Sequence, residues 1–385
     1  MKLLFISSRF PQPFGKADSM TVYRIVEYLS QRHEIYVVCF YEDQEELTYL
    51  PILREICKEV RYIPLKKYKV MLNMCYSLFT AGMPLQTAYY LDGEMKKAVD
   101  NMIEKYKPNL VYAHLIRMAE YIKQKKSVKR VLAMQISQTL NYGRMIANIN
   151  LPFYKIIYNI EYKKVRRYES KITRHFDSCL LISEYDKESI DHHKDIHNIF
   201  YSPHGVDVAY YTNSNNIEKE NAILFCGVLE TPTNMDAVLY FYRDIYPLVK
   251  SRIPDIRLYL VGKNPPKTIR KIAKNDSSVV ITGYVKDVRP YYAKTKVGID
   301  PLRIGAGLQN KLLIGMSMGQ PMVCTSIANE GIGAEDGKHL LIADNPQSFA
   351  DAIIELLRND EKLQSISQEA RKYVERKWTW EYHLR

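Results

Sequence analysis

The sequence predicts two doubly wound α/β units, each a parallel sheet with helices on both faces. Short apolar runs of buried-strand type alternate with amphipathic helical segments through the first half of the chain, and this order is typical of parallel sheets. The same alternation restarts near residue 221, after a polar joint at 201–221 that contains a proline and several asparagines. A length of 385 residues is enough for two domains of ordinary size.

Five apolar runs in the first half predict buried strands. Between the first two runs, residues 19–32 predict a helix, because apolar side chains such as Val22, Ile25 and Val26 recur every three or four positions. Residues 93–106 predict a second helix in the same half. The expected strands are residues 2–8, 34–41, 108–114, 130–137 and 178–184.

The second half contains six strand candidates separated by helical segments, and it ends in a helical tail at 361–385. The expected strands are residues 221–228, 256–263, 278–285, 296–302, 321–326 and 339–344. The expected helices are residues 234–252, 266–274, 288–295, 308–319 and 346–359. Ligands of open parallel sheets bind beyond the carboxyl ends of the strands, so we expect the site in the loops that follow these strands.

The composition is that of a soluble globular protein, with 46% apolar and 25% charged residues. No apolar run reaches the roughly 20 residues that a membrane span needs. The N-terminal apolar run is too short for a signal peptide and predicts a first strand instead. The six cysteines are scattered without a CxxC pair, which favours reduced thiols in a cytoplasmic protein over a disulfide scaffold or a zinc site.

The net charge of +12 is concentrated in one stretch of the chain. Residues 61–174 hold 22 Lys and Arg against seven Asp and Glu. A solvated basic surface would account for this excess, and so would contact with an anionic partner such as acidic lipid head groups or a polyphosphate. The chain contains no recognised nucleic-acid-binding motif, so we expect no nucleic-acid partner.

Residues 301–323, PLRIGAGLQNKLLIGMSMGQPMV, predict a phosphate-binding loop. A strand expected to end at Pro301 leads into a loop with Gly305 and Gly307, which let the backbone approach an anion closely. The helix expected to begin near Leu308 points its unpaired N–H groups and its positive dipole end at that loop. Arg303 and Lys311 flank the loop, and cations at a helix N-terminus are unfavourable unless an anion binds there. The alternative is a plain strand-to-helix turn. The whole stretch contains no carboxylate.

Residues 222–380 resemble the C-terminal domain of the group 1 (family-4) glycosyltransferases, most closely a bacterial subgroup that builds exopolysaccharides. The matching segments are 225–249, 259–262, 279–293, 300–323, 329–344 and 349–359, with weaker matches at 7–38, 82–90, 168–184 and 203–207. The resemblance covers nearly the whole chain and implies the GT-B fold, in which two Rossmann-like domains face a central cleft. The implied domains are 1–205 for the acceptor, 206–365 for the nucleotide-sugar, and a helix at 366–385 that crosses back to the first domain.

The resemblance also implies an activity: transfer of a sugar from a UDP- or GDP-linked donor to a lipid-linked or polysaccharide acceptor, with retention and without a required metal or other cofactor. It suggests bacterial surface glycan synthesis at the inner face of a membrane, with the protein cytoplasmic or peripheral. Arg303 and Lys311 would neutralise the leaving phosphate, and His114 would lie near the transferred sugar. The implied donor-binding residues are Gly15, Gly227, Gly283, Tyr284, Val285, Gly305, Ala306, Gly307, Leu308 and Ile314.

The sequence departs from the family pattern at several of these positions. Typical members have two glutamates eight positions apart, where this chain has Ala306 and Ile314. The usual NGVD segment has His204 in place of asparagine, and an aspartate pair of the subgroup is missing from residues 134–144. These losses leave open a rival from another class, a non-catalytic GT-B subunit that binds a partner or a glycan. A sugar epimerase or phosphorylase is a weaker rival, and the loop after the first strand lacks the GxGxxG of a dinucleotide dehydrogenase.

Two further segments have alternative interpretations. Residues 66–85 are basic and then apolar, which fits either a helix in a membrane interface or an ordinary core helix. In the tail, Trp378 and Trp380 are expected to pack against the body of the protein without a catalytic role.

Overall fold

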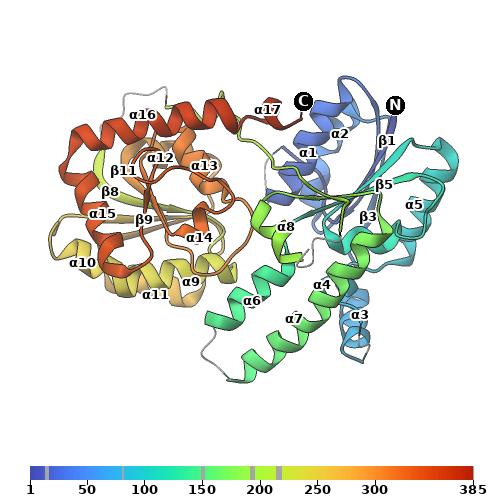
Figure 1. Ribbon diagram of the computed structural model, residues 1–385, viewed down its shortest axis with the longest axis horizontal. Coiled ribbons are helices and arrows are strands. Elements are labelled where there is room, and N and C mark those ends of the chain that lie inside the picture. Colours follow the sequence, from blue (N-terminus) through green and yellow to red (C-terminus); the bar gives the residue numbers. More distant parts are fainter. Residues whose placement is uncertain (14–16, 80–81, 149–151, 191–195, 214–218, 385) are drawn as a thin grey trace. The chain divides into compact units, whose positions relative to one another are not determined.

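The computed structural model describes residues 1–385 except 14–16, 80–81, 149–151, 191–195, 214–218 and 385. The chain divides into two compact units, unit 1 over residues 1–203 and unit 2 over residues 204–383 (Figure 1). This division falls beside the domain boundary expected at 205–206. Each unit contains a parallel sheet covered by helices, as the alternation of strands and helices predicts.

Unit 1 has a seven-stranded sheet in the order β3-β2-β1-β4-β5-β6-β7, and every neighbouring pair is parallel. The strands are β1 (Lys2–Ser7), β2 (Glu34–Tyr41), β3 (Glu59–Pro64), β4 (Leu110–His114), β5 (Lys129–Gln135), β6 (Ser178–Leu181) and β7 (Ile199–Tyr201). The two edge strands, β3 and β7, were not predicted from the sequence. β3 contains the charged residues Glu59 and Arg61, and β7 has only three residues. Neither strand therefore forms the apolar run of a central strand.

The helices of unit 1 connect these strands and cover both faces of the sheet. They are α1 (Ala17–Ser30), α2 (Leu50–Ile56), α3 (Lys67–Phe79), α4 (Leu85–Tyr89), α5 (Gly93–Tyr106), α6 (Gln138–Asn148), α7 (Pro152–Ile172) and α8 (Glu184–Ile190). Short 3-10 turns add Gln44–Tyr49, Ile116–Tyr121 and Thr173–His175. No helix in the described part of the chain is long and apolar enough to cross a membrane.

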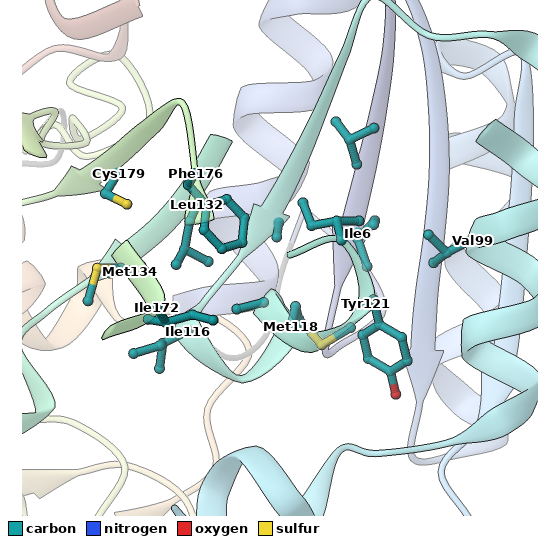
Figure 2. Packing of buried hydrophobic residues seen from close by; sticks show 14 of the residues in the cluster. Ile6, Val99, Ile116, Met118, Tyr121, Leu132, Met134, Ile172, Phe176 and Cys179 are labelled. Atoms are coloured by element: carbon teal, nitrogen blue, oxygen red, sulfur yellow. The ribbon is translucent and has the colours of Figure 1, made fainter. Parts of the chain in front are cut away.

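Alternating side chains of the central strands divide the core of unit 1 into two layers. Leu4 and Ile6 of β1 point to one face, where they pack with Val99 of α5 and with Met118 and Tyr121 of the turn after β4 (Figure 2). Successive strand residues point to opposite faces. The residues between them, such as Leu3 and Phe5, are buried on the other face. Both faces are therefore apolar, which explains why these strands are continuous apolar runs in the sequence.

Unit 2 has a six-stranded parallel sheet in the order β10-β9-β8-β11-β12-β13. The strands are β8 (Glu220–Cys226), β9 (Arg257–Val261), β10 (Val279–Gly283), β11 (Thr295–Asp300), β12 (Met322–Cys324) and β13 (Leu341–Ile342). The helices are α9 (Pro232–Tyr240), α10 (Tyr246–Lys250), α11 (Lys267–Asn275), α12 (Arg289–Lys294), α13 (Asn310–Ser317), α14 (Ser326–Asn329), α15 (Pro346–Arg358), α16 (Asp360–Lys377) and α17 (Trp380–Leu384).

The single helix expected at 234–252 is interrupted. A π-helical turn at Phe241–Ile245 separates α9 from α10, and Pro247 lies in the first turn of α10. Proline has no backbone N–H and so removes one hydrogen bond from the helical ladder, which accounts for the irregular turn before it.

The tail forms α16, which packs on α13 and α15 within unit 2. Trp378 is buried, and Trp380 stacks on His204. The expected crossing of the tail to the first domain stays a prediction.

Glu169 of α7 is a buried carboxylate that caps another helix. Its oxygens accept hydrogen bonds from the backbone N–H groups of Gln138 and Thr139 at the start of α6, at 2.7 and 3.0 Å. The side chain is only 1% exposed. Burial raises the pKa of Glu169 to about 7, although the hydrogen bonds that it accepts oppose this shift.

We expect the Glu169 carboxyl to make unit 1 less stable as the pH rises. Its pKa is about 4.5 in the unfolded chain and about 7 in the folded one, so its stabilising contribution is complete below pH 4.5 and is lost as the pH rises through 7. The loss amounts to about 3 kcal/mol. Urea unfolding of the wild type and Glu169→Gln from pH 4.5 to 7.5 checks this: the glutamine variant should show the flatter dependence, and parallel curves would contradict the assignment.

Candidate functional site

The strand order of unit 2 reverses between β8 and β11. Chain connections lead from β8 outward through β9 to β10 on one side, and from β11 outward through β12 to β13 on the other. Loops that leave neighbouring strands in opposite directions create a crevice at the carboxyl edge of the sheet, which is where ligands of such sheets bind. The loop of residues 301–309, with its two glycines, follows β11 and lies at this point.

The backbone of this loop needs its glycines. Gly305 has a φ of 150° and Gly307 a φ of 73°, which L-residues with a side chain rarely adopt. A Cβ atom on Gly331 would lie 2.4 Å from the carbonyl oxygen of Gly307, so a second backbone segment packs directly behind the loop. Helix α13 begins at Asn310, two residues later than expected, and its N-cap Gln309 makes no side-chain capping bond.

Lys311 lies in the first turn of α13 with two protein partners for its ammonium group. The Nζ atom donates to Oδ1 of Asp300 and to Oδ1 of Asn234, both at 3.1 Å. Asp300 ends β11, and Asn234 lies in the first turn of α9, where Thr231 is the N-cap. Since an ammonium group has three N–H donors, this geometry leaves one for a ligand at the loop.

Asp300 is the buried counter-charge of this arrangement. Its side chain is fully buried, and Oδ2 has no hydrogen-bond partner among the described residues. Burial raises the pKa of Asp300, and the ammonium group of Lys311 opposes that shift. The carboxyl is therefore dependent on Lys311 for its charged form.

Arg303 also has a carboxylate partner from another element. Its guanidinium forms a two-pronged ion pair with Asp236 of α9, with Nε 3.0 Å from Oδ2 and Nη2 2.5 Å from Oδ1. Its Cζ atom lies 4.5 Å from the ring centre of Tyr240. The acids missing from residues 301–323 are thus supplied by α9 and by the last residue of β11, and they orient both expected cations.

Gly227 follows β8 and lies under the same crevice. A Cβ atom on Gly227 would lie 2.8 Å from Nδ2 of Asn234, the residue that holds Lys311. Gly262, after β9, approaches even more closely, because its Cβ would lie 1.7 Å from the carbonyl oxygen of Gly227. The ends of β8 and β9 therefore contact each other directly through backbone atoms, next to the predicted phosphate position.

The residues predicted to line the base pocket occupy the edge of β10. Gly283 ends this strand with a φ of 69°, and Tyr284 after it is 71% exposed. Val285 and Ile314 are partly buried against one apolar cluster that includes Leu224 of β8. The structure thus brings Val285 and Ile314 to one patch and leaves the Tyr284 ring open to solvent. Ile314 fills the usual glutamate position with an apolar contact.

Ala306 and Leu308 complete the loop. Leu308 is buried, whereas Ala306 is partly exposed between the two glycines. No side-chain carboxylate stands at Ala306 to take the role of the first family glutamate.

His204 contacts the first residue of α13. Its Nε2 atom lies 2.8 Å from Oδ1 of Asn310, and its ring stacks on Trp380 with 5.7 Å between ring centres. Burial lowers the pKa of His204, and its hydrogen bond to Asn310 opposes this shift. A neutral imidazole here links the start of unit 2 to the helix that carries Lys311.

His114 belongs to unit 1 and ends β4, next to β1, where the order of that sheet reverses. Two arginines meet Asp18 nearby: Nη2 of Arg117 lies 2.8 Å and Nε of Arg9 2.7 Å from its Oδ2. Burial alone would raise the pKa of Asp18, but Arg117, Arg9 and His114 together lower it. Leu115 follows with a φ of 73°, a strained backbone of the kind that clusters at functional sites.

Gly15 lies outside the described residues. The other predicted donor residues belong to unit 2, as do Arg303 and Lys311, whereas His114 belongs to unit 1. In the described part of the chain, no cluster of three or more His, Cys, Asp or Glu side chains could hold a metal ion.

Three residues that hold the expected cations were not predicted from the sequence: Asn234, Asp236 and Asp300. A signal for the first two was present, because Thr231 followed by Pro232 is typical of a helix N-terminus and places the next residues beside the strand ends. Asp300 resembles any polar residue at the end of a buried strand. Its pairing with Lys311 depends on how the chain folds back over the sheet.

Comparison with known proteins shows what the second half of the chain is similar to. Residues 220–359 match the protein-family model described as "Glycosyl transferases group 1". Over 391 aligned residues, the chain is 24% identical to an uncharacterized 44.6 kDa protein in the cps region of Klebsiella pneumoniae, and the alignment covers 97% of this chain and 95% of that protein.

Solved structures show the same two-unit fold. The chain resembles Anabaena Alr3699/HepE in complex with UDP and glucose, with a TM-score of 0.68 at 13% identity, covering 98% of this chain and 96% of that one. It resembles the sucrose-phosphate synthase of Thermosynechococcus elongatus with a TM-score of 0.73 at 13% identity, covering 100% and 96%. A mutant of S. aureus TarM bound to Fondaparinux, alpha-GlcNAc-glycerol and UDP gives 0.69 at 11% identity, covering 100% and 98%. The fold is GT-B.

Proposed function

We propose that this chain, a GT-B protein whose C-terminal unit carries a group 1 glycosyltransferase domain, transfers a sugar from a nucleotide-sugar to a lipid-linked or polysaccharide acceptor. The supporting observation is Lys311, held by Asp300 and Asn234 at the start of α13 beside the Gly305–Gly307 loop. A phosphate-binding loop of this kind fits the diphosphate of a UDP- or GDP-linked sugar. The cps region that encodes the Klebsiella relative supports a role in bacterial surface glycan synthesis.

The proposed chemistry depends on charge at the leaving phosphate. Backbone N–H groups of residues 305–308 bind the diphosphate, and Lys311 and Arg303 stabilise the negative charge that grows as the sugar leaves. The departing phosphate takes the proton of the acceptor hydroxyl on the same face of the sugar, which gives retention. His114 is proposed beside the transferred sugar, and no protein nucleophile or metal ion takes part.

The nucleoside half of the donor is proposed to lie toward β10. This strand is two positions from β8 in the sheet, a distance of about 10 Å at the usual strand spacing. The exposed ring of Tyr284 can stack on a base, and Gly283 lets the backbone approach it. Ile314 offers the ribose an apolar contact in place of the usual carboxylate. Gly227, Val285, Ala306 and Leu308 line this path, and Gly15 is proposed near the same diphosphate and the acceptor.

The acceptor is proposed to bind unit 1, residues 1–205 in the predicted division, while residues 206–365 bind the donor and the tail at 366–385 crosses back. The basic stretch at 61–174 favours an acceptor carried on a phosphorylated lipid and a peripheral position at the cytoplasmic face of a membrane.

We expect one nucleotide diphosphate to raise the melting temperature of the protein. Ligand at 100 times its dissociation constant adds roughly 2.7 kcal/mol, so UDP, GDP, ADP, CMP and their sugar conjugates can be compared in a thermal-shift assay. Arg303→Ala should weaken that ligand about tenfold or more, because it removes a charged hydrogen-bond donor and leaves Asp236 unbalanced beside the phosphate.

Arg252→Ala is the matched control. Arg252 pairs with Asp351 and is 45% exposed, and it precedes β9 at the opposite edge of the sheet from the loop, so its loss should leave the shift unchanged. If a well-folded sample responds to none of these nucleotides, the proposal fails and the non-catalytic subunit replaces it.

A further inference from the structure

Two helices of unit 1 expose a concentration of large apolar side chains. On α7, the exposed residues Phe153, Ile156, Ile157 and Ile160 follow the i, i+3, i+4, i+7 spacing of one helical face. Of the 17 exposed large hydrophobic residues in the described part of the chain, nine lie on α3 or α7. We call these nine the α3–α7 surface: Tyr68, Met71, Leu72, Met74, Phe153, Tyr154, Ile156, Ile157 and Ile160.

The two helices are fixed to each other within unit 1. Nζ of Lys164 on α7 donates to the carbonyl oxygen of Ser77 on α3 at 2.6 Å. One turn earlier, Oε1 of Glu161 accepts from the backbone N–H of Leu85, which begins α4. Figure 1 shows α3, α6 and α7 extending from the same side of the sheet. The apolar side chains therefore belong to one projecting part of unit 1.

Neighbouring elements do not bury this surface. Helix α6 contacts α7 through Tyr142 and Tyr158, whose ring centres are 5.9 Å apart. Phe153 nevertheless remains 70% exposed and Ile156 60% exposed. On α3, Met71 is 68% exposed, so this side of the helix does not pack into the core, although Val70 beside it is buried. A concentration of exposed apolar side chains on two linked helices is typical of a binding surface.

The charges near the α3–α7 surface indicate which kind of partner it binds. No Asp or Glu occurs in residues 61–91 or 121–160. Five cations on the two helices are exposed and form no ion pair with any described residue: Lys67, Lys155, Lys163, Arg166 and Arg167. A second copy of the chain would bring the same positive charges to the contact and be repelled. An anionic partner is favoured instead.

We propose that the α3–α7 surface inserts into the interfacial layer of an anionic lipid bilayer. At 1.5 Å per residue, Phe153 to Ile160 spans about 10 Å along the helix axis, so a helix that lies in the plane of the interface can bury all four apolar side chains of this face together. Lys163, Arg166 and Arg167 lie on the next turns of the same helix, where they meet the phosphate head groups. This inference extends the proposed function by naming the surface that binds the membrane. Only its link to a lipid-linked acceptor rests on the proposed function.

Vesicle co-sedimentation of the full chain tests this surface. Vesicles of phosphatidylcholine alone are compared with vesicles that also contain phosphatidylglycerol. The wild type should bind the anionic vesicles, and added salt should weaken that binding. Ile156→Ser with Ile160→Ser should weaken it tenfold or more. Lys163→Gln with Arg167→Gln should weaken it roughly 25-fold and reduce the preference for phosphatidylglycerol.

The matched control is Tyr185→Ser with Phe200→Ser, which removes two aromatic residues of unit 1 that are 52% and 49% exposed but lie off the surface. This variant should bind like the wild type. Equal binding of all variants, or no binding by the wild type, would overturn the proposal. A wild type that sediments as a dimer, and becomes monomeric on replacing Ile156 and Ile160, would overturn it in favour of a copy-to-copy contact.

Thermal shifts with nucleotide on the same samples separate this proposal from the proposed function. A nucleotide shift without vesicle binding removes the α3–α7 surface and leaves the transferase. Vesicle binding without any nucleotide shift keeps the surface and removes the transferase.

Discussion

Lys311→Ala should lower the free energy of unfolding by about 3–5 kcal/mol, in addition to abolishing donor binding. The Asp300 carboxyl beneath it is fully buried, and Lys311 is its ion-pair partner at 3.1 Å. Removing the ammonium group leaves an unbalanced buried charge or forces the carboxyl to take up a proton. The pKa of Asp300, already raised by burial, should therefore rise further in this variant.

This effect can be separated from the effect on the ligand with a double-mutant cycle. Asp300→Asn removes the charge, and Lys311→Ala in that background should recover most of the stability lost in the single variant. Denaturant unfolding of the four proteins gives the coupling. Lys338→Ala, which breaks an exposed pair with Glu335, is the control and should change stability by less than about 1 kcal/mol. Additive losses at Lys311 and Asp300 would show that the pair carries no coupling.

The double variant, in which neither position is charged, then tests the binding site. The double variant Asp300→Asn with Lys311→Ala could be stable and still bind a nucleoside diphosphate with the affinity of the wild type. In that case Lys311 does not bind the phosphate. Loss of nucleotide binding in this folded variant is the expected result.

Gly262→Ala should destabilise the protein by about 3 kcal/mol or more and weaken donor binding. A methyl group there would lie 1.7 Å from the carbonyl oxygen of Gly227, and backbone cannot move aside as a flexible side chain can. The φ of 157° at Gly262 adds strain for any L-residue. Relief requires the loop after β8 to shift, and that loop holds Asn234 by a hydrogen bond from Nδ2 to the carbonyl of Val228.

Gly93→Ala is the control for the loss of a glycine. A Cβ at Gly93 would meet nothing within 4 Å, and the residue begins α5, so alanine should be neutral or stabilise by about 0.4–1 kcal/mol. Thermal and urea unfolding compare the two variants. A Gly262→Ala protein within 0.5 kcal/mol of the wild type would show that the backbone contact between the β8 and β9 loops is not close.

The sequence predicted those features of the fold and the site that depend on a local pattern of residues. Gly305 and Gly307 between an apolar strand and an apolar helix predict the loop, because positive φ and close backbone approach are properties of the residue itself. The central strands were predictable because they are buried on both faces. The edge strands β3 and β7 were not, since half-exposed or very short strands lack the apolar run.

The partners of the cations could not be predicted from spacing. Arg303 and Asp236 are 67 positions apart, as are many residues that never meet. Their pairing depends on β8 and β11 being neighbours in the sheet, because the helix after β8 and the loop after β11 then meet at the same edge. Residues 301–323 contain no acid, and the folded chain supplies Asp236 and Asp300 as partners of Arg303 and Lys311 from neighbouring elements. These two aspartates do not replace the glutamates expected at Ala306 and Ile314. Which residues share an edge of the sheet is decided by tertiary structure.

The start and the end of unit 2 meet, because Val206 and Thr379 form a parallel bridge, and the N–H of Val206 donates to the carbonyl of Trp378 at 2.7 Å. Gly205 allows this contact, since its Cβ would lie 2.2 Å from the backbone nitrogen of Trp380. A domain whose two ends are side by side can be exchanged between proteins as a cassette without stretching either junction. A chimaera with crossovers at Val206 and Thr379 should therefore exchange unit 2 of one such protein for that of another while unit 1 keeps its own fold.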